Sequence, residues 1–307
     1  MIGRDEVRYA LTGPFMSLTT PFLENGDIDF EGVRRILDYT IEEGGSRAVI
    51  MTYGDSLYSL LSEGDIAELT RVVVQHVSGR AMVVASDSFW ATRQTIQFAR
   101  YARDLGADML MVRPPDWANS CTVDSLVQHY ADVAAEGGIP LMTVTNFLAP
   151  RPLAFSQAVL KRLREEVDGI YAVKDDLHGE FAIRLSLLVH DRWALFTSGT
   201  KREVFNAVPY GADGYMSIFI LLNPKVAHDF FGAIKAGDLD AVRATITDHD
   251  IPLCDYIDEC EGGGDAAMHG ILELKGLAQR WRRKPYHSFT NEQMEQFADL
   301  CRTRGWV

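Results

Sequence analysis

Short apolar runs alternate with longer amphipathic stretches along most of the chain. Runs of this length, bounded by polar turn formers, predict buried parallel strands. They lie at residues 15–22, 48–52, 81–86, 109–114, 141–146, 170–176, 194–198 and 214–218. Helical spacing of apolar residues predicts helices at residues 30–43, 63–77, 92–106, 123–135 and 156–166, and short helical connections after the last two runs. This rhythm is that of βα units in a parallel sheet.

Eight such strands within about 210 residues predict a (β/α)8 barrel, the TIM barrel of the α/β class. A doubly wound sheet is the alternative, but it usually has fewer strands and often a glycine-rich phosphate loop, which residues 19–27 lack. The pattern after the eighth run contains only helices, at residues 224–236, 239–259, 266–280 and 291–304, with a break at 261–265. We therefore expect a barrel over residues 1–222 and a helical region over 223–307 packed on it.

Composition and charge narrow the possible partners. The 307 residues carry a formal net charge of −13, which argues against nucleic acid or an anionic membrane as a partner. The four cysteines form no CxxC pair and no metal-finger spacing, so we expect reduced thiols. The N-terminus is charged where a signal peptide is apolar, and no apolar run approaches the ~18 residues of a membrane span. These features predict a cytoplasmic protein.

The most informative run is IYAVKDD at residues 170–176, because a lysine closes it. Strand alternation puts Lys174 on one face with Ile170 and Ala172. An apolar face partly desolvates an ammonium group and favours the neutral amine, which is a nucleophile. The alternative is a lysine that ends a strand and reaches solvent beside Asp175 and Asp176.

Polar residues also close other predicted strands, and in a barrel the active site gathers at the C-terminal ends of the strands. Thr143 and Thr145 share one face of the fifth strand, which is unusual for a face that only packs in a core. Thr52 could also simply cap the turn before Gly54, and Arg113 could bridge to a surface carboxylate. Together with the lysine, these strand ends suit a carbonyl substrate that bears a carboxylate. The residues concerned are Thr52, Arg113, Thr145, Ser198 and Gly199.

The chain contains ordered blocks at residues 17–33 (SLTTPFLENGDIDFEGV), 51–65 (MTYGDSLYSLLSEGD), 170–176 (IYAVKDD) and 198–218 (SGTKREVFNAVPYGADGYMSI). Together these blocks resemble the dihydrodipicolinate synthase and N-acetylneuraminate lyase family of Schiff-base aldolases. The resemblance runs from about residue 13 to the C-terminus. Residues 17–33 are similar to the family's opening TPF segment, residues 51–65 to its GTTGE loop, residues 170–176 to its lysine strand and residues 198–218 to its seventh and eighth strands.

The resemblance implies that Lys174 attacks the ketone of pyruvate or a longer 2-oxo acid and forms an imine. It further implies that the turn formed by Thr52, Tyr53 and Gly54 binds the substrate carboxylate through hydroxyl and backbone N–H groups. No metal and no organic cofactor is expected, since the covalent imine replaces one. A homodimer or homotetramer is also implied, with residues 108–118 near an interface. Further expected substrate-binding residues are Arg113, Gly199 and Met216.

Departures from the family's pattern argue against an authentic dihydrodipicolinate synthase. Thr145 matches the position of the family's catalytic tyrosine, and we expect it to move protons only through a water or the substrate. Tyr53 replaces the second threonine of GTTGE and could supply the lost phenol. Asp116 or Trp117 replaces a second tyrosine that crosses a subunit interface. Arg151 matches the family's arginine only if one residue is inserted.

The leading hypothesis is a lysine-dependent lyase acting on a 2-oxo acid, as an aldolase or a dehydratase of a keto-deoxy sugar acid. The rival is a family member that binds a 2-oxo acid in a regulatory role without turnover. A metal-dependent barrel hydrolase is disfavoured, because none of the eight runs ends in histidine. His178 is a candidate proton shuttle or a surface residue. The acidic stretch 247–261 fits no metal motif and is expected to be a solvated or subunit-facing helix.

Overall fold

Eight parallel strands form the centre of the molecule. The structure is a computed structural model that describes residues 2–307. The strands close into a barrel in chain order, which confirms the predicted (β/α)8 fold. They are β1 (Gly13–Ser17), β2 (Ala48–Ile50), β3 (Met82–Ser86), β4 (Met109–Val112), β5 (Leu141–Val144), β6 (Ile170–Asp175), β7 (Ala194–Thr197) and β8 (Gly214–Met216).

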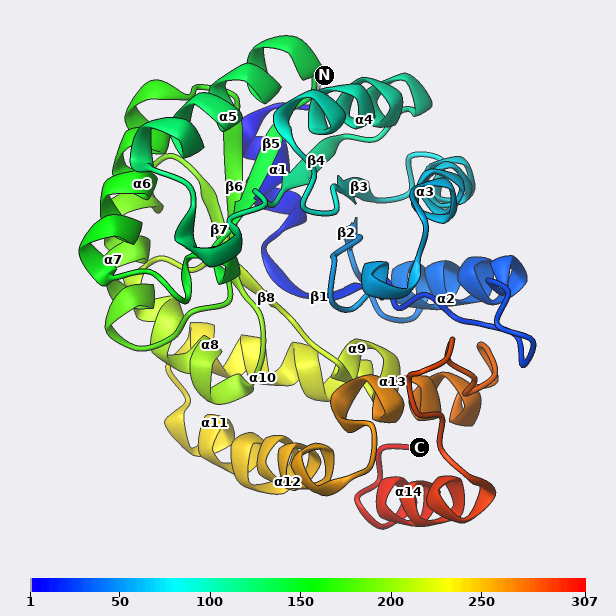
Figure 1. The fold of residues 1–307 in the computed structure, drawn as a ribbon. Coiled ribbons are helices and arrows are strands. Elements are labelled where there is room, and N and C mark those ends of the chain that lie inside the picture. The colour runs from blue at the N-terminus through cyan, green and yellow to red at the C-terminus, as the bar shows by residue number, and fades with distance from the viewer. Residues whose placement is uncertain (1) are drawn as a thin grey trace. The chain divides into compact units, whose positions relative to one another are not determined.

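Helices separate the strands as expected, and two of the helices found were not predicted. The unpredicted ones are α1, before the barrel, and α7, between β6 and β7. The helices up to β8 are α1 (Arg4–Ala10), α2 (Phe30–Glu42), α3 (Glu63–Val77), α4 (Thr92–Leu105), α5 (Val123–Gly137), α6 (Leu153–Glu166), α7 (Glu180–Val189) and α8 (Lys201–Ala207). In Figure 1, α5, α6 and α7 follow one another along the outer side of β4 to β7.

Local sequence explains where these helices begin and end. Ser62 and Asp65 form a capping box at the start of α3, in which each side chain accepts a hydrogen bond from the other residue's backbone N–H. Thr122 caps α5 in a similar way. Gly106 ends α4 with a φ of +101°, a conformation that glycine adopts without a steric penalty.

The observed strands are shorter than the apolar runs that predicted them. In the fifth run, the polar residues that close the run lie outside the strand. β5 ends at Val144, and Thr145 starts a short 3₁₀ turn. Along β4 and β5 every residue is buried, as expected for strands covered on both faces. Val144 pairs with Lys174 in register, and Lys174 pairs with Phe196 on β7.

The region after β8 is helical but differs from the prediction at the π-helix and at both ends of the helix predicted over residues 266–280, which ends at Leu274. A π-helix over Ile246–Asp250 interrupts the stretch expected as one helix, next to Pro252, which has no N–H to continue the α-helical ladder. The next helix begins at Gly263, inside the expected break, after Gly262 with a φ of +81°. The helices are α9 (Phe219–Leu222), α10 (Pro224–Ala236), α11 (Leu239–Thr245), α12 (Ile251–Glu259), α13 (Gly263–Leu274) and α14 (Asn291–Thr303).

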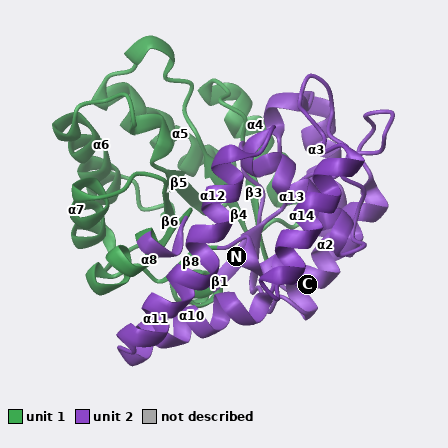
Figure 2. Cartoon of the chain, turned by 90° about the horizontal axis from the view of Figure 1, so that it is seen from below, with its two compact units in different colours: residues 1–13, 82–199, 203–216 green, residues 14–81, 200–202, 217–307 purple. Residues whose placement is uncertain are grey.

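The chain divides into two compact units, coloured separately in Figure 2. The first unit contains residues 1–13, 82–199 and 203–216, and therefore β3 to β8. The second contains residues 14–81, 200–202 and 217–307. The expected boundary at residue 222 stays a prediction. Within residues 2–307 no helix has both the length and the apolar character needed to cross a bilayer.

Candidate active site

Lys174 lies near the C-terminal end of β6 in the first unit. Only 6% of this residue is exposed, so it does not reach out into solvent as the alternative interpretation required. Its strand neighbours in register are the apolar residues Val144 and Phe196. Lys174 thus has apolar residues beside it on both neighbouring strands, and its role as a nucleophile stays a prediction.

Asp176 is the charged partner of Lys174. The Lys174 ammonium forms an ion pair with Asp176 Oδ1, and the Ser198 hydroxyl donates a hydrogen bond to the same oxygen. A carboxylate in this position stabilises the ammonium and is also placed to accept its proton. Sequence reasoning missed this role, although the signal was present in the two aspartates that follow the lysine.

Thr145 contacts the other aspartate, Asp175. Its hydroxyl donates to Asp175 Oδ1 at 2.7 Å and accepts from the backbone N–H of Asp176 at 2.8 Å. Asp175 is 2% exposed, and this burial raises the pKa of its carboxyl to about 6, against hydrogen bonds from Thr145 and the Leu177 N–H. The Thr145 hydroxyl proton is therefore already engaged, and a catalytic role for Thr145 stays a prediction.

The Thr143 hydroxyl has a structural partner. It lies 2.8 Å from the hydroxyl of Tyr130 on α5, which itself donates to the Val112 carbonyl at 2.9 Å. Tyr130 is fully buried, and burial raises the pKa of its phenol. These contacts link β4, β5 and α5, so the presence of two threonines on one strand face is explained in part by packing.

Arg113 follows β4 directly. Its backbone N–H donates to Asp87 at 2.8 Å, and its guanidinium lies over the Phe89 ring, 3.8 Å from the ring centroid. Asp87 also accepts a hydrogen bond from Thr95 on α4. Asp87 is completely buried, and this burial raises the pKa of its carboxyl to about 8. Substrate binding by Arg113 stays a prediction.

The turn containing Thr52, Tyr53 and Gly54 belongs to the second unit. The Thr52 hydroxyl accepts from the Asp55 N–H at 3.0 Å and lies 3.2 Å from Asp55 Oδ2, to which it donates. Ser17 donates to the same carboxylate oxygen at 2.7 Å. Thr52 thus caps its own turn, as the alternative interpretation held. Among residues 2–307, apart from Gly54 and its two chain neighbours, no heavy atom lies within 4 Å of the point where a side chain on Gly54 would begin, so this turn has open space beside it.

The last two predicted strand-end positions differ in character. Gly199 has a φ of +101°, a backbone conformation that favours glycine, and Met216 ends β8 with 8% exposure.

The second unit contains a further buried lysine, Lys201, which is 2% exposed and has its Nζ 3.7 Å from the Phe219 ring centroid. Burial lowers the pKa of Lys201 to about 8, against the charge of Asp250. The sequence offered no signal for a second buried lysine.

Arg151 and His178 are candidate site residues with a weaker sequence argument, and each has a charged partner in the first unit. Arg151 forms a two-pronged ion pair with Asp116 at 2.8 and 2.9 Å, and both side chains are less than 10% exposed. His178 pairs with Glu203 at 3.3 Å. Across residues 2–307, no group of three or more histidine, cysteine or acidic side chains is arranged to hold a metal ion.

Comparison with known proteins decides the family. Residues 10–303 match the model of the Dihydrodipicolinate synthetase family. The chain belongs to this family. It is 29% identical over 252 residues to 4-hydroxy-tetrahydrodipicolinate synthase from Psychrobacter arcticus, covering 80% of each chain. It is 26% identical to the probable 5-dehydro-4-deoxyglucarate dehydratase 2 of Streptomyces coelicolor, covering 84% of this chain and 78% of that one.

The fold comparison agrees. Dihydrodipicolinate synthase from Oceanobacillus iheyensis superposes with a TM-score of 0.85 at 18% identity, over 99% of each chain. Because members of the dihydrodipicolinate synthetase family are lyases, this chain is an enzyme of the class I aldolase and lyase type. Its low identity to the named synthases agrees with the expectation that it is not an authentic dihydrodipicolinate synthase.

Proposed function

We propose that this protein is a lyase that forms an imine between Lys174 and pyruvate or a longer 2-oxo acid. The observation that carries the proposal is the buried Lys174 at the end of β6, with its ammonium paired to Asp176. Nucleophilic attack requires the neutral amine, and Asp176 is the adjacent group that can accept the ammonium proton. The proposal requires no metal and no organic cofactor.

The chemistry balances with the groups of this chain and the substrate. The ammonium proton passes to Asp176, and the neutral amine of Lys174 adds to the C2 carbonyl of the substrate. Asp176 returns this proton to the former carbonyl oxygen, which leaves as water when the imine forms. The imine accepts electrons from C3. Either the C3–C4 bond then breaks, as the C4 hydroxyl loses its proton and becomes a carbonyl, or C3 loses a proton and the hydroxyl at C4 departs as water.

The substrate carboxylate is proposed to bind at the turn of Thr52, Tyr53 and Gly54. Since the Thr52 hydroxyl donates to Asp55 and the Thr52 N–H donates to the Ser56 hydroxyl, the backbone N–H of Gly54 is the donor that we propose for the carboxylate. We propose either carbon–carbon bond chemistry or dehydration, because one of the relatives reported above is named a synthase and the other a dehydratase. Arg113, Gly199 and Met216 are proposed as further contacts along the substrate chain.

Borohydride trapping tests the imine. Incubation with pyruvate and sodium borohydride should add one reduced pyruvyl group to the protein, located on Lys174 by peptide mass spectrometry. Lys174→Ala should abolish the adduct. The matched control is Lys161→Ala, which removes an exposed lysine of α6 and should leave trapping unchanged. An adduct that persists in Lys174→Ala would show that the nucleophile is elsewhere.

A binding role without turnover is the second candidate, and one observation favours it. The residue at the position of the family's tyrosine, Thr145, donates its proton to Asp175 instead of to a substrate. A screen of 2-oxo acids separates the two candidates, with released pyruvate and loss of water as the two readouts. Turnover of any member of the panel supports the lyase. Uniform inactivity in protein that still forms the borohydride adduct supports the binding role.

A further inference from the structure

A small pocket lies on the side of β6 and β7 that faces α7 and α8. It encloses about 160 Å³ and belongs entirely to the first unit. Asp175 and Thr197 are partners in register on the neighbouring strands, so they lie side by side at its base. Strand alternation places Asp175 on the opposite face of β6 from Lys174. The pocket is thus behind the lysine strand and distinct from the face that carries the amine.

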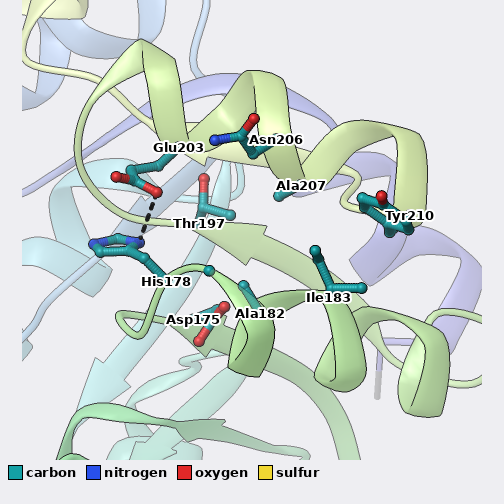
Figure 3. A pocket seen from close by; sticks show the side chains of 10 residues that line it. Asp175, His178, Ala182, Ile183, Thr197, Glu203, Asn206, Ala207 and Tyr210 are labelled. Atoms are coloured by element: carbon teal, nitrogen blue, oxygen red, sulfur yellow. Dashed lines mark ion pairs between the residues drawn. The ribbon is translucent and has the colours of Figure 1, made fainter.

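The lining of the pocket combines acidic and apolar groups. Figure 3 shows His178 and Glu203 facing each other as an ion pair, with Asn206 and Tyr210 also at the pocket. The acidic and basic groups that line the pocket are the carboxyl groups of Asp175 and Glu203 and the imidazole of His178. The apolar part of the wall comes from Ala182, Ile183 and Ala207. Such a lining is complementary to a small cation that carries a short aliphatic chain.

Thr197 supplies an independent sign of a missing ligand. It projects from β7 toward α8 into the pocket, and only 3% of it is exposed. Among the residues that the structure describes, its hydroxyl oxygen has no hydrogen-bond partner. A buried hydroxyl without a partner has lost its hydrogen bonds to water without replacement, so a ligand that bonds to it recovers part of that desolvation cost.

We infer that this pocket binds a small primary ammonium compound. Its ammonium group contacts the carboxylates of Asp175 and Glu203, and a hydroxyl or a second N–H group on the ligand bonds to Thr197. The volume is below the roughly 300–1,000 Å³ of sites for drug-sized ligands, which restricts the ligand to a few heavy atoms. Short amino alcohols meet these requirements. The inference goes beyond imine formation and does not depend on it.

Asp175 joins this site to the active-site strand. The carboxylate that lines the pocket also accepts the Thr145 hydroxyl proton, and Asp175 directly follows Lys174 in β6. At a pKa of about 6 the carboxyl is mostly ionised at pH 7.5, the form that attracts an ammonium group. An occupant would therefore contact a residue that already positions the end of the lysine strand.

Ligand-observed NMR titration with ethanolamine at pH 7.5, without any 2-oxo acid, tests the site. We expect saturable binding with a Kd below about 10 mM, and binding of ethylene glycol and of glycolate at least about tenfold weaker. Glycolate keeps the hydroxyl of ethanolamine but carries a negative charge. Ethylene glycol also keeps the hydroxyl but carries no charge. Equal or tighter binding of glycolate, or no saturation by ethanolamine up to about 100 mM, would overturn the inference.

Variants locate the binding. Glu203→Gln should weaken ethanolamine binding at least about tenfold through loss of a charge, and Thr197→Val should weaken it about threefold or more. Thr197→Val removes an unpaired hydroxyl and keeps the side-chain shape, so it should fold at least as stably as the natural chain. Glu165→Gln, an exposed substitution on α6, is the control that should change nothing. A loss of affinity in Glu165→Gln that equals the loss in Glu203→Gln would mean nonspecific attraction to an acidic protein.

Discussion

Two adjacent aspartates follow Lys174, and their environments give them opposite character. Asp176 holds an ion pair with the lysine and accepts a hydrogen bond from Ser198. Asp175 lies on the other face, where burial raises the pKa of its carboxyl to about 6. Consecutive residues of a strand face opposite sides, so Asp176 pairs with the amine of Lys174 whereas Asp175 lines a different pocket.

Replacing Asp176 with Asn tests how the ion pair controls the amine. Asp176→Asn removes the group that we propose as acceptor of the ammonium proton and keeps a side chain of similar size. We expect borohydride trapping of pyruvate at pH 7.5 to slow by about 10²-fold, as measured by adduct yield against time. Ser198→Ala, which keeps the carboxylate, is the control and should slow trapping much less. Trapping at the natural rate in Asp176→Asn would show that the pair does not govern reactivity.

Tyr53 is the residue that could replace the missing phenol. If Tyr53 moves protons at C3 of the bound 2-oxo acid, Tyr53→Phe should slow exchange of the pyruvate methyl protons with D2O by about 10²-fold, because general acid–base groups contribute roughly that much. The exchange is followed by NMR and needs no knowledge of the full substrate. Thr145→Val is the comparison. If Tyr53→Phe exchanges at the normal rate and Thr145→Val does not, Thr145 is the relay.

At the scale of elements, buried polar groups tie strands to the helices that cover them. Asp87, directly after β3, accepts hydrogen bonds from the Arg113 backbone after β4 and from Thr95 on α4. Tyr130 on α5 similarly contacts Thr143 on β5. Each of these groups is buried, so each must be hydrogen-bonded to avoid a desolvation penalty. They fix how strands and helices meet without entering the proposed chemistry.

Asp87 should leave a signature in the dependence of stability on pH. Its carboxyl has a pKa raised to about 8 in the folded chain, so the folded state keeps a proton that the unfolded chain releases above about pH 4. Its contribution to stability is complete below about pH 4 and is lost as the pH rises through 8. Asp87→Asn removes this loss and preserves an oxygen that accepts from the Arg113 N–H.

Urea unfolding at pH 5, 7 and 8.5 measures the effect. The free energy of unfolding of Asp87→Asn, relative to that of the natural chain, should rise across this range with a slope of up to about 1.4 kcal/mol per pH unit. Glu165→Gln provides the exposed control and should follow the natural chain at each pH. Parallel curves for Asp87→Asn and the natural chain would contradict the raised pKa.

At the scale of the whole molecule, periodicity predicts the barrel because covered parallel strands read as continuous apolar runs. All eight runs correspond to strands, and the helix at residues 63–77 has the predicted ends. The periodicity did not reveal α7, which begins after a glycine with a φ of +66°, or the π-helix at 246–250. The ion pair between Lys174 and Asp176 was also missed, although Asp176 lies only two residues further along the chain, because contacts between neighbouring polar residues depend on turn geometry that spacing alone does not encode.

The assembly state is the remaining prediction, and Trp117 is the residue that tests it. The side chain lies in a 3₁₀ turn over Trp117–Asn119 and is 87% exposed, beside Asp116, whose buried ion pair with Arg151 braces the turn. A large exposed aromatic on a braced loop is typical of an interface. It also falls within residues 108–118, the region that the family resemblance associates with subunit contact.

We expect analytical ultracentrifugation of the natural chain to show a homodimer or homotetramer. Trp117→Asp should weaken its association about 30-fold or more, because a central aromatic typically contributes at least about 2 kcal/mol. Leu187→Asp is the matched control, since Leu187 is an apolar residue of α7 that is 58% exposed and lies outside the predicted interface. A charge at position 187 should leave the molecular mass of the assembly unchanged. If Leu187→Asp dissociates the assembly and Trp117→Asp does not, the interface lies on the α7 side of the first unit instead of at the Trp117 turn.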